Sequence, residues 1–120
     1  MPKGKPRGPM TIEALVNESA RIAKSKGWHN ISATFAEKLC LVHSEVSEAL
    51  EDFRTGRLVN EIYYEGEDKD KPCGVPIELA DVMIRVADLC YLYNIDLQEA
   101  IWIKQDYNET RSHLHGGKKL

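Results

Sequence analysis

The chain has 120 residues, enough for a single domain with a hydrophobic core, and a net charge of −3. Its composition of 42% hydrophobic and 29% charged residues is that of an ordinary soluble globular protein. No apolar run approaches the roughly 20 residues that span a bilayer, and the start lacks a signal-peptide apolar region, so we expect a cytoplasmic protein without membrane contact. An acidic middle, at residues 61–70, argues against binding a nucleic-acid polymer. The three cysteines lack any Cys-x-x-Cys spacing, which indicates neither a disulfide framework nor a zinc site.

Prolines and glycines crowd the N-terminus, and residues 1–10 are predicted to be a disordered arm. Residues 11–120 then form one helical domain, with a flexible tail from about residue 113. The first helix is expected from about Thr11 to Lys26, because its apolar residues recur at steps of three and four. Gly27 suits the end of this helix.

The second helix opens at Thr34, which is followed by Glu37 at the spacing of a capping box. Apolar residues continue at helical spacing until Gly56, where the helix is expected to end. Residues 57–74 form a long polar connection, within which residues 62–64 are expected to pair briefly as an extended segment.

Pro76 suits the first turn of a third helix, and Asn94 suits its C-terminal exit. Asp96 with Glu99 is a capping pattern for a fourth helix. The pattern therefore predicts an all-α fold, a bundle of four helices.

The third helix carries the most informative pattern in the chain. Of residues 77–90, ten are apolar, and the polar ones, Glu78, Asp81, Arg85 and Asp88, fall on a single stripe. A helix that is apolar all round is expected to be buried, so its charges need partners that neutralise them. Four helices in one small layer cannot cover such a helix on every side, so we expect its spare apolar face to meet another subunit.

The second helix carries a matching pair of carboxylates, Glu45 and Glu48. Each pair has i, i+3 spacing, which places both carboxylates on one helix face. Carboxylates that converge in a core favour hard cations, so Glu45, Glu48, Glu78 and Asp81 are candidate ligands for Mg²⁺, with Mn²⁺ as a substitute.

The fourth helix changes character along one face. Leu97, Ala100 and Ile101 begin an inward stripe that Lys104, Tyr107, Asn108 and Arg111 continue. An inner face that becomes cationic is expected to approach an anion. Carboxylates, a metal ion and cationic side chains together describe a polyphosphate site.

These segments resemble one known family. Glu45-Val-Ser-Glu48, Glu78-Leu-Ala-Asp81, the run from Lys104 to Arg111, and His115-Gly-Gly-Lys-Lys are similar to motifs of the MazG-type all-α nucleoside triphosphate pyrophosphohydrolases, in their compact single-domain form. The resemblance implies an enzyme that hydrolyses a nucleoside triphosphate between the α and β phosphates, giving the monophosphate and pyrophosphate. It also implies Mg²⁺ held by the four acids, and a homodimer or a homotetramer built as a dimer of dimers.

The same resemblance suggests roles for individual residues. Glu48, the second acid of the first pair, takes the proton from the attacking water. Phosphate oxygens are held by Lys104, Asn108 and Arg111, while Arg85 and Lys38 either join them or orient the acids. A base pocket is implied near the first helix and the following turn, where Trp28 offers a stacking surface and Asn17 an amide.

Other interpretations stay open. Glu78 and Asp81 alternatively form structural ion pairs with Arg85, and Lys104 and Arg111 alternatively favour the negative end of their helix dipole. A phosphoribosyl-ATP pyrophosphohydrolase-like enzyme and a non-catalytic module that binds Mg-nucleotide are the alternative functions. A di-iron four-helix protein is disfavoured because the chain has no Glu-x-x-His.

Overall fold

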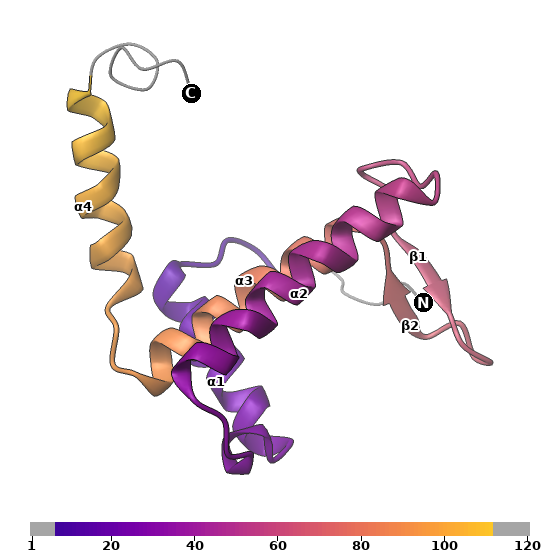
Figure 1. Cartoon of the computed structure of the whole chain (residues 1–120), viewed down its shortest axis with the longest axis horizontal. Coiled ribbons are helices and arrows are strands. Elements are labelled where there is room, and N and C mark those ends of the chain that lie inside the picture. Colours follow the sequence, from indigo (N-terminus) through magenta and orange to yellow (C-terminus); the bar gives the residue numbers. More distant parts are fainter. Residues whose placement is uncertain (1–6, 112–120) are drawn as a thin grey trace.

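The computed structural model describes residues 7–111, so the predicted tail and most of the predicted N-terminal arm lie outside the described residues. Within that range the chain is mostly helical, as predicted, with one small hairpin (Figure 1). No described helix is both long and apolar enough to cross a membrane. The elements in chain order are α1 (Ile12–Ser25), the 3₁₀ turn η1 (Trp28–Asn30), α2 (Phe35–Arg54), β1 (Tyr63–Glu65), β2 (Lys71–Cys73), α3 (Val75–Leu92) and α4 (Leu97–Thr110).

The predicted helix starts are confirmed by their capping hydrogen bonds. Thr34 Oγ1 accepts from the Glu37 backbone N–H at 3.1 Å, and the Glu37 carboxylate accepts from the Thr34 N–H at 3.0 Å. Asp96 caps α4 by accepting from the Glu99 N–H at 3.0 Å. These bonds satisfy backbone donors that the first helical turn leaves unpaired.

Residues in the left-handed region follow three of the helices. Gly27, at φ +79°, follows α1, Gly56, at φ +97°, follows α2, and Asn94, at φ +53°, follows α3. A positive φ costs little for glycine and is tolerated by asparagine, so the sequence at these three ends suits a change of chain direction.

The connection from residue 57 to residue 74 contains an antiparallel hairpin. Tyr63 pairs with Cys73 and Glu65 with Lys71, which confirms the predicted extended segment and adds its partner strand. Gly74, at φ +119°, joins β2 directly to α3, and a Cβ there would collide with the carbonyl oxygen of Glu61. Glycine is therefore required by both the backbone angle and the close approach.

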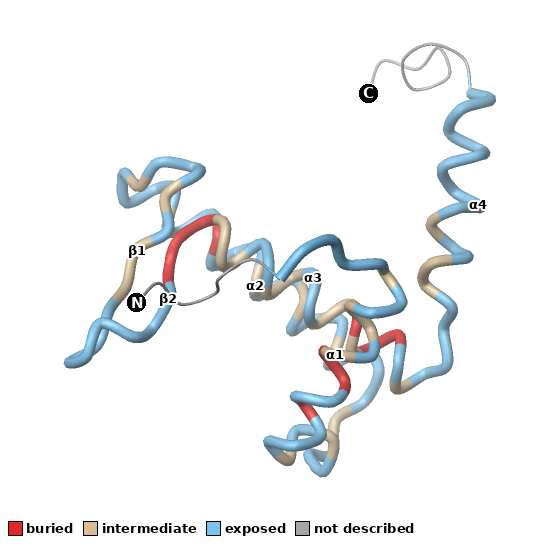
Figure 2. The backbone as a smooth tube through the Cα atoms, turned by 180° about the vertical axis from the view of Figure 1, so that it is seen from behind, coloured by how far each residue is buried: buried red, intermediate tan, exposed pale blue. Residues whose placement is uncertain are grey.

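Helix α3 packs against both α1 and α2, and buried stretches lie on α1 and α3 and at the junction of β2 with α3 (Figure 2). Small side chains make the closest contacts, with Ala23 on α1, Ala49 on α2 and Ala87 on α3 all buried. The third helix keeps an uncovered apolar face in the single chain, as predicted, since Leu79 is 51% and Met83 49% exposed.

Helix α4 leaves the bundle and projects away from α2 and α3 (Figure 1). None of its residues is buried, and its principal contact in the described chain is with α1. One bond ties its first turn to α1, where the Glu13 backbone N–H donates to the Gln98 side-chain oxygen at 3.4 Å. The prediction that one face of this helix points inward is therefore wrong within one chain, because α4 projects outward after the turn at Asn94.

Candidate functional site

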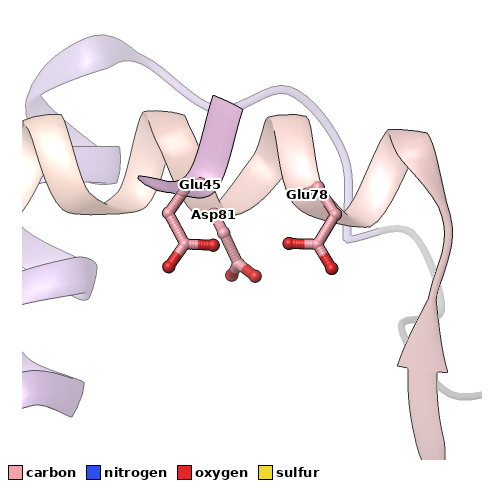
Figure 3. A group of neighbouring side chains, drawn as sticks. All are labelled: Glu45, Glu78 and Asp81. Atoms are coloured by element: carbon pink, nitrogen blue, oxygen red, sulfur yellow. The ribbon is translucent and has the colours of Figure 1, made fainter. Parts of the chain in front are cut away.

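Three of the four predicted metal ligands meet on one side of α3. Glu45 comes from α2, and Glu78 and Asp81 come from successive turns of α3, with carboxylates that point the same way (Figure 3). One oxygen of each carboxylate lies within 4.8 Å of the others. All three side chains are half-buried. We call these residues the acidic cluster.

Electrostatic repulsion within the cluster affects the acids on α3. Burial raises the pKa of Glu78, and the nearby charges of Asp81, Glu45, Asp52 and Glu48 raise it further. Burial also raises the pKa of Asp81, with Glu45 adding to the effect. A site that disfavours its own negative charges stabilises a bound cation, and an all-carboxylate donor set suits a hard divalent ion.

Arg85 is the cation that the structure places beside the cluster. Its Nε donates to Glu45 Oε1 at 2.7 Å, and the Glu45 side chain is only 14% exposed. Arg85 also lowers the pKa of Asp81 by its charge, in opposition to burial. The ion pair of Arg85 is thus with Glu45, on another helix, where it orients this carboxylate.

Glu48 lies on the same face of α2 as Glu45 but is not part of the close cluster. Its side chain is exposed, although its charge still raises the pKa of Glu78. An exposed carboxylate near the cluster can reach a water on its outer side. The predicted set of four acids thus becomes a close set of three, with Glu48 beside it.

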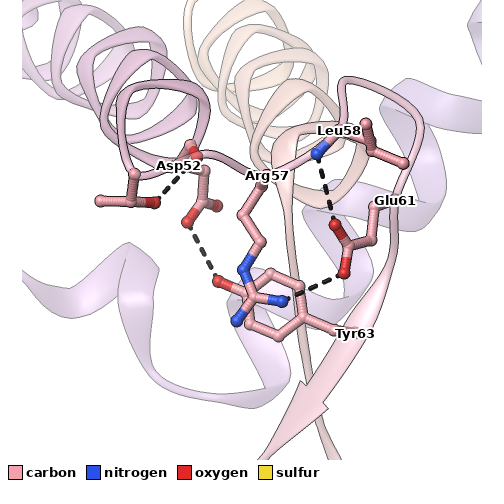
Figure 4. A network of polar contacts seen from close by, with 6 residues as sticks. Asp52, Arg57, Leu58, Glu61 and Tyr63 are labelled. Carbon is pink, nitrogen blue, oxygen red and sulfur yellow. Dashed lines mark hydrogen bonds and ion pairs between the residues drawn. The ribbon is translucent and has the colours of Figure 1, made fainter.

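Asp52 is a further acid that the sequence analysis did not assign to the site. It follows Glu45 by seven residues, a spacing that keeps both on one helix face, and its charge also raises the pKa of Glu78. The Tyr63 hydroxyl donates to Asp52 Oδ1 at 3.0 Å (Figure 4). This spacing along α2 was the signal that could have identified it.

The hairpin holds Tyr63 in place through Arg57. The Arg57 guanidinium carbon lies 3.6 Å from the centre of the Tyr63 ring, and Arg57 Nη1 donates to Glu61 at 3.0 Å (Figure 4). Bonding to Asp52, followed by burial, raises the pKa of Tyr63. The loop therefore fixes the C-terminal end of α2, and with it the orientation of Asp52.

A cavity of about 750 Å³ opens beside the acidic cluster. Glu45, Asp81 and Arg85 form part of its wall, which links the cavity to the cluster. The rest of the wall is mostly apolar and comes from α1, α2, α3 and the turn between α1 and α2. A cavity of this size, with charged residues in a mostly apolar wall, suits a ligand with a polar group and a ring.

Three of the predicted ligand-binding residues, Trp28, Lys38 and Arg85, line this cavity, and Asn17 does not. Trp28 is part of the wall and is 54% exposed, so its ring is available for stacking. Lys38 is also part of the wall and is half-buried. Asn17 is exposed and lies outside the wall, whereas Glu18 and Ser19 on the neighbouring face of α1 line it.

A histidine–aspartate pair joins His29, in the turn after α1, to Asp88, a residue of the cavity wall. His29 Nε2 and Asp88 Oδ1 are 2.8 Å apart, with both side chains largely buried. The His29 ring stacks on Tyr91 at a centroid distance of 6.1 Å. The partners are 59 positions apart in sequence, so no local spacing indicated the pair.

The predicted phosphate-binding residues of α4 are not brought to the cluster within one chain. Lys104, Asn108 and Arg111 are all exposed on the projecting helix (Figure 1). Lys104 Nζ lies 5.0 Å from the centre of the Tyr107 ring, and the Arg111 guanidinium carbon lies 5.8 Å from it. They form a cationic patch that no described acid of the cluster contacts.

Comparison with known proteins identified no relative. A scan against protein-family models found no match, and a search of curated proteins found no significantly similar sequence. The chemistry of the site is therefore argued from its own residues.

Proposed function

We propose that this protein is a Mg²⁺-dependent nucleoside triphosphate pyrophosphohydrolase of the MazG type. The observation that carries the proposal is the acidic cluster, of which Glu45 and Asp81 line a cavity that also presents Trp28 and Lys38. Carboxylates suit Mg²⁺, the cations suit phosphate, and the indole suits a base. Few other ligands combine these three chemistries.

The donor set of the cluster fits the proposed cation. Glu45, Glu78 and Asp81 supply only oxygen ligands, and their mutual repulsion is relieved when a divalent ion binds. Mn²⁺, which also accepts oxygen ligands, is the expected substitute. A bound Mg²⁺ supplies polarisation of phosphate oxygens and a lower pKa for a coordinated water.

The side chains around the cluster have distinct roles in the proposed hydrolysis. Water adds across the bond between the α and β phosphates, giving the monophosphate and pyrophosphate. Glu48, at the outer edge of the cluster, accepts the proton of the attacking water. Lys38 holds phosphate oxygens, and Arg85, which also lines the cavity, keeps the Glu45 carboxylate in place.

A second subunit completes this proposal. The apolar side chains left exposed on α2 and α3 need a cover, and the cationic patch of α4 needs an anion. In a homodimer, or a homotetramer built from two dimers, Lys104, Asn108 and Arg111 reach the phosphates bound in the partner's site. We place the assembly in the cytoplasm, where its nucleotide substrate is found.

Two alternatives are kept because specific observations favour them. The exposed position of Glu48, outside the close cluster, favours a non-catalytic module that binds Mg-nucleotide without hydrolysing it. The size of the cavity also admits a larger phosphoribosyl nucleotide, as in a phosphoribosyl-ATP pyrophosphohydrolase-like enzyme.

The proposal is tested by incubating the protein with ribo- and deoxynucleoside triphosphates, with and without Mg²⁺, and separating pyrophosphate from orthophosphate. Metal-dependent release of pyrophosphate and monophosphate is expected. Glu78→Gln should lower the rate by at least about 100-fold, because a ligand of the cluster is lost. Glu67→Gln, an exposed site in the hairpin turn, is the matched control.

Three outcomes separate the possibilities. Release of orthophosphate alone would contradict cleavage between the α and β phosphates. Mg-dependent binding without turnover would support the non-catalytic module. Turnover of phosphoribosyl-ATP in preference to every triphosphate would support the alternative enzyme.

A further inference from the structure

The side chains of α3 that line the cavity form a line leading away from the acidic cluster. Asp81, Arg85, Asp88 and Leu92 follow one another at steps of three or four residues, and all are part of the wall. With a rise of about 1.5 Å per residue, Asp88 lies roughly 10 Å along the helix from Asp81. That separation is comparable with the distance from the phosphates of a nucleotide to its sugar and base.

Asp88 is held in a fixed orientation at this distance from the cluster. Its Oδ1 is bonded to His29 Nε2 at 2.8 Å, and its side chain is 20% exposed. Among residues 7–111, the hydrogen bond and ion pair of Asp88 are made by Oδ1 and not by Oδ2, and Asp88 is part of the cavity wall. An anchored carboxylate with one open oxygen is a directed hydrogen-bond acceptor.

The surroundings of Asp88 make its choice of ligand selective. Leu89, Leu92 and Ile31 line the same cavity, and their apolar side chains offer a polar group of the ligand no hydrogen bond. A ligand N–H or O–H beside Oδ2 forms a charge-assisted bond, whereas a ligand carbonyl leaves two acceptors unpaired. Hydrogen-bonding sites of this kind discriminate strongly against analogues that lack the matching group.

We propose that Asp88, positioned by His29, determines specificity by accepting a hydrogen bond from a donor group on the nucleoside part of the substrate. This inference rests on the proposed function, since it assumes that phosphates occupy the acidic cluster. The shared chemistry is an N–H of the base or a hydroxyl of the sugar. His29 is a positioning residue, held by its stacking on Tyr91.

The test compares substrates that differ by one donor, with wild-type protein and Asp88→Asn. The base arm pairs dCTP with the pyrimidin-2-one analogue, dUTP with N3-methyl-dUTP, and dGTP with dITP. The sugar arm compares ribo-, deoxy- and 2′,3′-dideoxynucleotides carrying one base. Values of kcat and KM are measured for each, with Asp68→Asn, an exposed loop site, as the matched control.

In the wild type, removal of the recognised donor should lower kcat/KM by at least about tenfold. Asp88→Asn should abolish this difference in kcat/KM between the two substrates. It should raise KM for the donor-bearing substrate about tenfold and change kcat less than about threefold. If Asp88→Asn removes the difference in kcat/KM within a pair of substrates in the base arm, the recognised donor is a base N–H. If it removes the difference within the sugar series, the donor is a hydroxyl. Ratios unchanged by Asp88→Asn in both arms would overturn the inference.

A second variant separates recognition from folding. His29→Gln keeps a hydrogen-bond donor for Asp88, so this variant should keep part of the kcat/KM preference for the donor-bearing substrate. His29→Ala has no such donor and should lose the preference. Both variants remain informative if Asp88→Asn does not fold. A ratio that His29→Ala leaves at the wild-type value would contradict the positioning role.

Calorimetric binding distinguishes failure of this inference from failure of the proposed function. If the wild type hydrolyses no triphosphate, the enzyme proposal fails, but dCMP, dUMP and their donor-lacking analogues still report on Asp88 through their dissociation constants. Binding of dCMP that Asp88→Asn weakens would support the inference without catalysis. Binding unaffected by Asp88→Asn, or absent altogether, would overturn it.

Discussion

The acidic cluster places three carboxylates so close together that the charge of Glu45 disfavours the charges of Glu78 and Asp81. Glu78 and Asp81 have raised pKa values because of burial first and neighbouring acids second. The ion pair between Arg85 and Glu45 offsets only part of this repulsion. The cluster is therefore a source of instability in the metal-free protein and a source of affinity for a cation.

This arrangement predicts a pH dependence of stability. The unfolded chain has ordinary values, 4.5 for Glu78 and 3.8 for Asp81, and the folded values are higher. Because the folded protein binds these protons more tightly than the unfolded chain, protonation stabilises the fold. This stabilisation is complete at a pH below the unfolded pKa values and is lost as the pH rises through the folded pKa values. Its size is about 1.4 kcal/mol for each unit by which the folded and unfolded pKa values differ. Metal-free protein should thus lose this part of its free energy of unfolding across that window.

Urea unfolding at a series of pH values measures this effect. Asp81→Asn isolates it, because the variant should show a smaller loss with rising pH than the wild type. Mg²⁺ at neutral pH should raise the melting temperature of the wild type and leave that of Asp81→Asn nearly unchanged. Equal stabilisation of both proteins by Mg²⁺ would contradict the assignment of the cluster.

The elements show which features the sequence could predict. Helix starts at Thr34 and Asp96 were predictable because capping involves residues only three positions apart. The outward direction of α4 could not be predicted, because a helical wheel describes the faces of a helix and not the direction that the helix takes after Asn94. Cys40 is exposed although it lies in an apolar stretch of α2, because a local apolar pattern does not show which face of a helix is covered.

The site was predictable to a similar degree. The i, i+3 spacing placed the acids on shared faces, and the structure brought Glu45, Glu78 and Asp81 together. In the structure Glu48 lies outside the acidic cluster, because two residues on the same helix face need not have side chains at the same distance from a third. The pair of His29 and Asp88 depends on the packing of distant segments, which the sequence does not show.

The capping box of α2 gives a prediction for this helix. Thr34→Ala removes the acceptor for the Glu37 N–H and should lower the free energy of unfolding by about 1 kcal/mol. Chemical denaturation measures the change. Thr110→Ala, at the exposed end of α4, is the control and should have less than half the effect. Equal effects would contradict a capping role for Thr34.

The junction between the hairpin and α3 gives a second prediction about stability. Gly74→Ala combines a left-handed backbone angle with a collision against the Glu61 carbonyl, so a loss of more than about 2 kcal/mol is expected. Gly56→Ala has a similar angle, φ +97°, but no atom near the added Cβ. The difference between the two variants in urea denaturation isolates the collision, and similar losses would show that only the angle matters.

At the scale of the whole molecule, the exposed apolar residues predict self-association. On α2 these are Val46, Leu50 and Phe53, exposed by 51%, 57% and 56%, at spacings that give one face. Light scattering at micromolar concentration should give at least twice the chain mass of 13.6 kDa. Leu50→Glu should shift the protein towards monomer, because a charge in an apolar interface is left unpaired.

Leu58→Glu is the control for this change. Leu58 is 68% exposed but lies in the loop after α2, outside the proposed interface, so this variant should keep the wild-type mass. A wild-type monomer that hydrolyses nucleotide at full rate would remove both the interface and the proposed role of α4 in the partner's site.

The projection of α4 also has a consequence for spectroscopy. A helix of 14 residues with no buried side chain is marginal in water, because nucleation is costly and packing contributes most of the stability of protein helices. Its helical content should then depend on whether another subunit covers it. Dilution below the dissociation constant of the assembly should therefore lower the circular dichroism signal at 222 nm, so that this helix reports on assembly.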